Sequence, residues 1–151
     1  MAAPDIRQLA DFLQESLQIE GIHRYPSNDE MVATQEFLKD PLTIRNVMAL
    51  QNVYAPGMPL RDQPGMDVRV GMHVPLSGGF LMRRALEDVL RIAHPYDIHI
   101  AFEKLHPFMD GNGRTGRAIW LHRMSAVYND PLNIGFLHRF YYQTLSKADH
   151  N

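Results

Sequence analysis

The sequence has no cysteine, no strong excess of either charge and no long apolar run, and each absence excludes a class of function. Without cysteine among its 151 residues, the chain has no disulfide bonds, no cysteine-ligated zinc and no cysteine nucleophile. Its net charge of −2 at pH 7 gives no general attraction to nucleic acid or to an anionic membrane. No apolar run reaches the ~18 residues that cross a bilayer, and residues 1–5 lack the pattern of a signal peptide. We therefore expect a cytoplasmic protein that acts on neither nucleic acid nor a membrane.

The residues that are present predict a single helical domain over 1–151. Apolar residues make up 45% of the chain, which is enough for a substantial core. They recur at three- and four-residue steps between glycine, proline and capping residues, as amphipathic helices require. The segment 96–105 also alternates like a strand, but we favour a helix there. Helices are expected at 5–21, 28–38, 41–55, 80–93, 96–105, 114–127 and 131–147.

The segment 55–79 is rich in proline and glycine and interrupts the helical pattern. Within it, two short runs of valine-containing sequence flank Gly71, and they predict a β-hairpin or one extended flap at 67–75. The predicted fold class is therefore all-α, a helical bundle with a small β-hairpin flap.

The residues with the clearest chemistry lie in one loop, 106–117, with the sequence HPFMDGNGRTGR. Gly111 and Gly113 allow backbone N–H groups to turn toward an anion, and the helix that follows adds its own free N–H groups and dipole. Arg114 and Arg117 lie three residues apart on one face of that helix, and their planar guanidinium groups match phosphate oxygens. Together these features predict a binding site for a nucleotide polyphosphate.

Two further residues of the loop supply groups that phosphoryl chemistry requires. The carboxylate of Asp110 is a hard oxygen ligand that suits Mg²⁺. His106 has an ordinary pKa near ~6.5, which suits a base that deprotonates a hydroxyl. In-line attack on phosphorus needs positioning, charge neutralisation and one proton acceptor, and the loop offers all three.

The loop resembles the signature of the Fic family, HPFx(D/E)GNGRxxR, and matches it at every specified position. The resemblance covers about residues 40–130. It implies an all-α Fic core in which 67–75 is the flap and 106–117 is the catalytic loop. It also implies the transfer of AMP from ATP, with Mg²⁺, to a Ser, Thr or Tyr hydroxyl of a target protein. A branch of the family that transfers phosphate has lysine where this chain has Gly113, which favours adenylyl transfer.

The resemblance also gives each loop residue a role. His106 would be the general base, Asp110 the Mg²⁺ ligand and Phe108 the anchor of the loop in the core. An anion hole would be formed by Gly111, Asn112 and Gly113, with Asn112 at the α-phosphate. Arg114 and Arg117 would hold the β- and γ-phosphates.

Residues 16–21, SLQIEG, resemble the inhibitory motif of the family, (S/T)xxxE(G/N). Ser16 and Glu20 are four residues apart and share one helix face. The resemblance implies that Glu20 pairs with Arg117, takes the place of the γ-phosphate and prevents productive ATP binding. Residues 5–21 are thus predicted to form an N-terminal inhibitory helix.

The flap is predicted to dock the target protein, because a short strand with a free edge can receive an extended segment. For Arg61 and Arg69 two contacts remain open, one with the target and one with the nucleotide. The alternatives for function are another nucleotidyl or phosphoryl transfer or de-AMPylation on the same loop, and a non-catalytic module that binds nucleotide or a partner protein. Assembly into a homo-oligomer is also left open. The predicted docking residues are Val68, Arg69, Val70, Met72, His73 and Val74.

Overall fold

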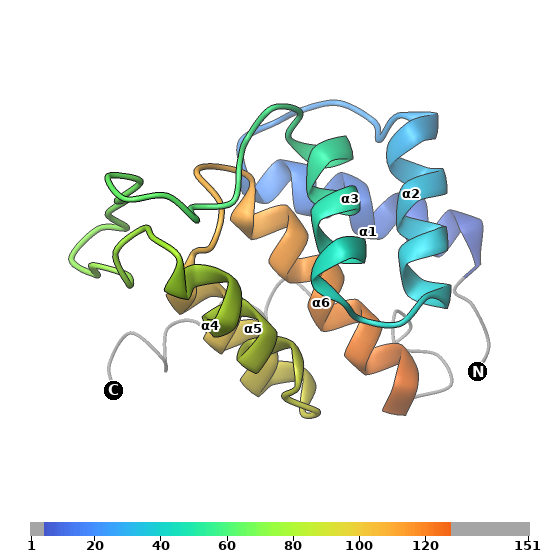
Figure 1. Cartoon of the computed structure of the whole chain (residues 1–151). Coiled ribbons are helices and arrows are strands. Elements are labelled where there is room, and N and C mark those ends of the chain that lie inside the picture. Colours follow the sequence, from blue (N-terminus) through green and yellow to red (C-terminus); the bar gives the residue numbers. More distant parts are fainter. Residues whose placement is uncertain (1–4, 128–151) are drawn as a thin grey trace.

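The computed structural model describes residues 5–127, which form six helices around one core (Figure 1). The all-α fold is confirmed, and so is the helical interpretation of 96–105. The C-terminal helix predicted at 131–147 lies outside the described residues. Within the described range, no helix is long and apolar enough to cross a membrane. The helices are α1 (Ile6–Ile19), α2 (Asn28–Lys39), α3 (Ile44–Tyr54), α4 (Leu81–Leu90), α5 (Pro95–Leu105) and α6 (Asn112–Val127).

Side-chain caps set the beginnings of the first three helices. Asp5 caps α1, and Ser27 and Glu30 form a reciprocal capping box at the start of α2. Thr43 caps α3 by accepting a hydrogen bond from the backbone N–H of Asn46 at 3.2 Å. The prediction that this helix begins at Pro41 is therefore wrong by three residues, because the threonine cap fixes its start.

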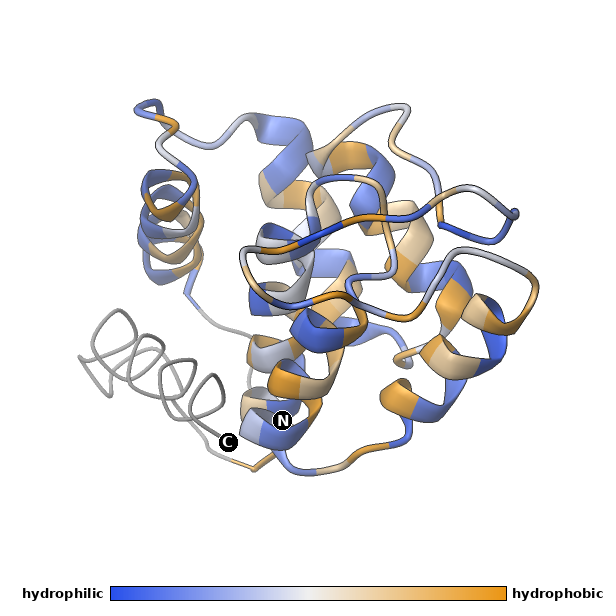
Figure 2. Ribbon diagram, turned by 90° about the vertical axis from the view of Figure 1, so that its left-hand side faces the viewer, coloured by the Kyte–Doolittle hydropathy of each residue, from blue (hydrophilic) through white to orange (hydrophobic). Residues whose placement is uncertain are grey.

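α6 runs through the bundle and packs against α1, α2, α3 and α5 (Figure 1). Its side chains are buried on nearly every side, which explains why it lacks the clear polar face that surface helices have. The surrounding helices alternate hydrophobic and hydrophilic residues along their length (Figure 2). Their apolar sides form one core together with α6, and this core includes Leu9, Val47, Leu86, Ile98, Phe102 and Ile119.

The segment between α3 and α4 forms a loop at the surface with less β-structure than predicted. The hairpin expected at 67–75 is a single antiparallel bridge between Val70 and His73, closed by a turn at Gly71 with a φ of 59°. Pro75 has no N–H group with which to continue the ladder. At the start of the next helix, Phe80 and Leu81 are 83% and 56% exposed. Helix α4 instead turns Met82, Leu86 and Leu90 toward the core.

Candidate active site

The loop that joins α5 to α6 has two residues in the left-handed backbone conformation. His106 ends α5 with a φ of 50°, which residues other than glycine rarely adopt. Gly111 has a φ of 82°, and a Cβ atom there would lie only 2.7 Å from the Cβ of Ala55. This geometry turns the chain from the candidate base directly into the first turn of α6, whose N–H groups have no partner within the helix.

Phe108 and Asn112 fix the shape of the loop. Phe108 is 1% exposed and forms an antiparallel bridge with Leu60, which buries the ring in the core. The amide of Asn112 accepts the N–H of Phe108 at 2.9 Å and donates to its carbonyl at 2.8 Å. Asn112 is 2% exposed, so its side-chain amide is enclosed within the loop and fully used in these two hydrogen bonds.

Gln51 of α3 connects Asp110 in the loop to Thr115 in the first turn of α6, a role that the sequence did not predict. Its Nε2 donates to the carbonyl of Asp110 at 2.6 Å, and its Oε1 accepts the hydroxyl of Thr115 at 2.6 Å. Gln51 is 1% exposed, so both hydrogen bonds are shielded from water. Gln51 therefore fixes the backbone of Asp110, the candidate metal ligand, relative to the first turn of α6.

Arg61 is fully buried and binds four backbone carbonyls. Its Nε donates to His106 O at 2.7 Å and its Nη2 to Leu105 O at 2.9 Å, while Nη1 donates to Met66 O and Leu76 O, both at 2.9 Å. The carbonyls of 105 and 106 lie at the C-terminal end of α5, where a positive charge is favourable. Arg61 therefore connects the base of the flap to the loop 106–117. Its burial rules out the two roles left open by the sequence, contact with a target or with a nucleotide.

Arg117 brings both residues of the predicted inhibitory motif to the loop. Its Nε donates to Ser16 Oγ at 2.6 Å, and its Nη2 donates to Ser16 O at 2.9 Å and to Glu20 Oε1 at 2.7 Å. The Arg117 side chain is 1% exposed, whereas that of Glu20 is 39% exposed at the end of α1. The charged pair therefore has one buried member and one that solvent reaches.

The carboxylate of Glu20 also lies directly against the start of α6. A Cβ atom at Gly113 would collide with Glu20 Oε1, the outer end of a flexible side chain, which shows how closely the carboxylate approaches the backbone of the loop. The N-terminus of a helix attracts anions through its free N–H groups and its dipole. Glu20 thus places a negative charge of the protein itself where the loop is suited to bind an anion.

Arg114 points to a different part of the protein from Arg117. Its Nη1 lies 3.8 Å from Glu30 Oε2, and its Cζ lies 5.9 Å from the centroid of the Tyr54 ring. The side chain is 15% exposed. Each of the two arginines predicted to hold phosphates is therefore next to a glutamate, one from α1 and one from α2.

Comparison with known families supplies the observation that decides the family. A sequence profile described as Fic/DOC family matches residues 42–122, which is more than half of the chain. The chain belongs to the Fic/DOC family. The match extends from the turn before α3 into α6, so it contains the flap and the loop 106–117 but not α1. None of the curated proteins compared with the chain matches it.

The surroundings of residues 106–117, named the Fic loop from here on, keep His106 neutral. Burial and the positive charge of Arg61 lower the pKa of His106, which is half-buried, and the nearby carboxylate of Asp110 only partly opposes them. At pH 7 the ring is therefore unprotonated, the form that can accept a proton from a hydroxyl.

Glu103 of α5 is a second acidic residue close to Arg117, and the sequence did not point to it. Burial raises the pKa of Glu103 to about 8, Arg117 opposes this shift and Glu20 adds to it. Its Oε1 is enclosed, and a Cβ atom at Gly116 would collide with it. Glu103 is therefore mostly protonated at pH 7, and the carboxylate that accepts the 2.7 Å hydrogen bond from Arg117 is that of Glu20.

Asp110 is exposed on the Fic loop, and its Oδ1 accepts the N–H of Gly111 at 2.8 Å. No group of three or more His, Asp or Glu residues suited to a metal ion occurs in residues 5–127. Mg²⁺ commonly takes only one or two carboxylates and completes its shell with substrate phosphates and water. The donors present therefore fit a Mg²⁺ ion that is shared with a nucleotide.

The predicted docking residues of the flap lie near the C-terminal end of α5. His73 Nε2 lies 2.8 Å from Lys104 O, and Arg69 donates to Gly71 O at 3.2 Å. The contact of His73 holds this part of the flap against Lys104, which lies two residues before His106 in the chain. The apolar side chains of the flap face solvent to different degrees: Val68 is half-buried, and Val70, Met72 and Val74 are exposed.

Proposed function

We propose that this Fic protein is a protein adenylyltransferase, which transfers AMP from ATP to a Ser, Thr or Tyr hydroxyl of a target protein. The proposal rests on the loop 106–117, which combines a neutral histidine, an exposed carboxylate and the anion-attracting start of α6. Membership of the Fic/DOC family supports nucleotidyl transfer as the class of reaction. The exposed flap at 67–75 is the proposed docking site for the target.

In the proposed reaction, the target hydroxyl attacks the α-phosphorus of ATP in line with the bond to pyrophosphate. His106 takes the hydroxyl proton as the new O–P bond forms, and pyrophosphate leaves with the electron pair of the broken P–O bond. The N–H groups at the start of α6, together with Arg114 and Arg117, stabilise the phosphate charge. The products are the AMP ester of the target, pyrophosphate and one proton on His106.

Asp110 is the proposed protein ligand of Mg²⁺ in this reaction. The bound ion would neutralise negative charge on the phosphates and on the leaving pyrophosphate. The hydrogen bond from Gln51 to the carbonyl of Asp110 fixes the backbone that carries this carboxylate. Asp110 therefore has a defined position relative to the first turn of α6.

We also propose that α1 restrains the activity through Glu20. Arg117 already donates to Ser16 and Glu20, and the Glu20 carboxylate lies against Gly113. A γ-phosphate would have to compete with that carboxylate for the same arginine and the same helix start. Removing the carboxylate should therefore admit the nucleotide.

The reaction type and the restraint can be tested together with ATP labelled at either the α- or the γ-phosphorus. We expect Glu20→Gly to become labelled from α-labelled ATP far more than the wild type, and neither protein to become labelled from γ-labelled ATP. Gln18→Gly, which introduces glycine at an exposed site of α1, should behave like the wild type. Adding His106→Ala to Glu20→Gly should abolish transfer while ATP binding remains.

Each other outcome supports a different function. Label from the γ-phosphorus would indicate phosphoryl transfer, and loss of label from an AMP-modified protein would indicate de-AMPylation. ATP binding without any transfer would favour the non-catalytic module. Equal labelling of the wild type and Glu20→Gly would contradict the role of Glu20.

A further inference from the structure

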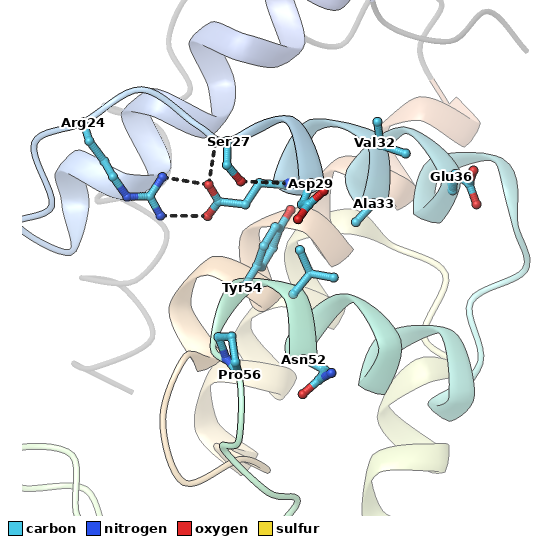
Figure 3. Close-up of a pocket in the computed structure, with 11 residues that line it drawn as sticks. Arg24, Ser27, Asp29, Val32, Ala33, Glu36, Asn52, Tyr54 and Pro56 are labelled. Carbon is cyan, nitrogen blue, oxygen red and sulfur yellow. Dashed lines mark hydrogen bonds and ion pairs between the residues drawn. The ribbon is translucent and has the colours of Figure 1, made fainter.

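Glu30 lies between two arginines, and only one of them belongs to the Fic loop. Arg24 forms a two-point contact with it, Nη1 to Oε1 at 2.7 Å and Nη2 to Oε2 at 3.0 Å (Figure 3). On the other side, Glu30 Oε2 lies 3.8 Å from Nη1 of Arg114. Glu30 is 5% exposed, so this carboxylate forms a buried link between α2 and the start of α6.

Glu30 remains charged despite its burial. Burial alone would raise the pKa of Glu30, but hydrogen bonds from Arg24 and Ser27 outweigh it and lower the pKa. Glu30 therefore attracts both arginines at neutral pH. Arg24 makes the two shorter contacts, so it neutralises most of the negative charge of Glu30. The rest of that charge attracts Arg114, at 3.8 Å.

Arg114 is also confined on its other sides. Its guanidinium lies over the ring of Tyr54, whose hydroxyl is fixed by a 2.6 Å hydrogen bond to Thr34 Oγ1. A small cavity next to it is lined by residues of α1, α2 and α3, including Ser16, Glu30 and Tyr54. A guanidinium that neutralises a buried carboxylate has less charge to offer a phosphate, because the two anions compete for it.

We propose that Glu30 is a positioning residue that acts through Arg114 and keeps this arginine away from the phosphates of ATP. Arg24 competes for the same carboxylate and so determines how strongly Glu30 attracts Arg114. The inference rests on the proposed use of ATP by the Fic loop. It adds a second restraint to that of Glu20, on a different arginine and from a different helix. In this arrangement, anything that draws Arg24 away from Glu30 tightens the hold on Arg114.

Arg24 is accessible from outside the protein, which makes it the adjustable member of the group. Its side chain is 46% exposed, compared with 6% for Glu30. It lines an open cavity of about 590 Å³ between α2 and α3, together with Ser27, Asp29, Glu36 and Tyr54 (Figure 3). The charge balance at Arg114 can therefore be altered by a substitution that leaves the loop untouched.

Two variants should change ATP binding in opposite directions. Glu30→Gln removes the charge but keeps a side chain that can still close the capping box with Ser27. It should lower the Kd for ATP by about two- to fivefold, because the contact with Arg114 is long, at 3.8 Å, and contributes no more than a weak ion pair does. Arg24→Gln leaves Glu30 to Arg114 alone and should raise the Kd by a similar factor. Both are made in the Glu20→Gly background with Mg²⁺ present, and Glu36→Gln, which removes an equal charge from the same helix and cavity, is the control.

A second measurement does not depend on ATP. Phenylglyoxal modifies accessible arginines, and its rate at Arg114 can be followed by peptide mass spectrometry. We expect faster modification of Arg114 in Glu30→Gln and slower modification in Arg24→Gln, with Glu36→Gln unchanged. General loosening of the fold would accelerate modification in both variants, and circular dichroism would detect it.

The results separate this inference from the proposed function. Weaker ATP binding in Glu30→Gln, or changes of the same sign in both variants, would overturn the restraint and indicate that Glu30 orients Arg114 for phosphate. If Glu20→Gly bound no ATP, the proposed function would fail, and the phenylglyoxal rates would still decide whether Glu30 holds Arg114. Unchanged rates at Arg114 in both variants would overturn the inference on their own.

Discussion

Replacing the buried Arg61 by methionine tests whether its hydrogen bonds join the flap to the loop 106–117. The variant would remove four hydrogen bonds from backbone carbonyls, at His106, Leu105, Met66 and Leu76. Hydrogen bonds to a charged group contribute about 1.5–3 kcal/mol each, which gives an upper range of about 6–12 kcal/mol. The buried guanidinium also loses its own hydration, and removing it recovers part of that cost. We expect the free energy of unfolding to fall by about 3–5 kcal/mol, a large part of the ~5–15 kcal/mol typical of a domain.

Urea unfolding monitored by the single, largely buried tryptophan, Trp120, measures this change. Arg61→Lys should fall between the wild type and Arg61→Met, because an ammonium group can bind only some of the four carbonyls. Arg84→Met is the control, since Arg84 is 75% exposed and makes one 3.8 Å contact with Asp88, and it should change the free energy by less than about 0.5 kcal/mol. If Arg61→Met lay within about 1 kcal/mol of the wild type, the assignment of Arg61 as the residue that joins flap and loop would be refuted.

Three further predictions concern the groups around the loop. Ser16→Ala should leave Nε of Arg117 without its acceptor, lower the free energy of unfolding by about 1–3 kcal/mol and raise auto-AMPylation by less than Glu20→Gly does; no loss of stability in urea would contradict the contact. Because its pKa is lowered, His106 should lose its proton below pH 6.5, so transfer by Glu20→Gly should rise with pH and level off before neutrality; an NMR titration of the ring with a midpoint above 6.5 would be inconsistent with this. Glu103 has a raised pKa of about 8, so its ionisation should cost folding stability progressively from its unfolded pKa near ~4.3 up to about pH 8. Glu103→Gln should remove that dependence, and parallel stability curves for the variant and the wild type would speak against a buried, neutral Glu103.

The sequence predicted those parts of the fold that depend on local patterns. Apolar spacing and capping residues placed the six helices of residues 5–127 to within a few positions, because neighbours along the chain determine helix ends. The largest error in the fold was the hairpin at 67–75. Valine-rich runs favour strands, but pairing also requires backbone donors, and Pro75 supplies none.

The site was predictable where its residues are contiguous in the chain. Residues 106–117 form one motif, and the structure brings Ser16 and Glu20 to Arg117 as the second motif implies. By contrast, Gln51 and Arg61 reach the loop from distant positions, and nothing in their local sequence marks them as buried. Glu103 was missed for a related reason, because its raised pKa comes from packing against α6 rather than from its neighbours in the chain.

The most direct test of the account is a crystal structure of Glu20→Gly with ATP and Mg²⁺. We predict that the triphosphate lies along the start of α6, with the α-phosphorus facing His106, the γ-phosphate at Arg117 and the metal ion at Asp110. A triphosphate in the reverse direction, with the γ-phosphorus facing His106, would contradict adenylyl transfer and favour phosphoryl transfer. A nucleotide bound away from residues 106–117 would contradict the proposed site itself.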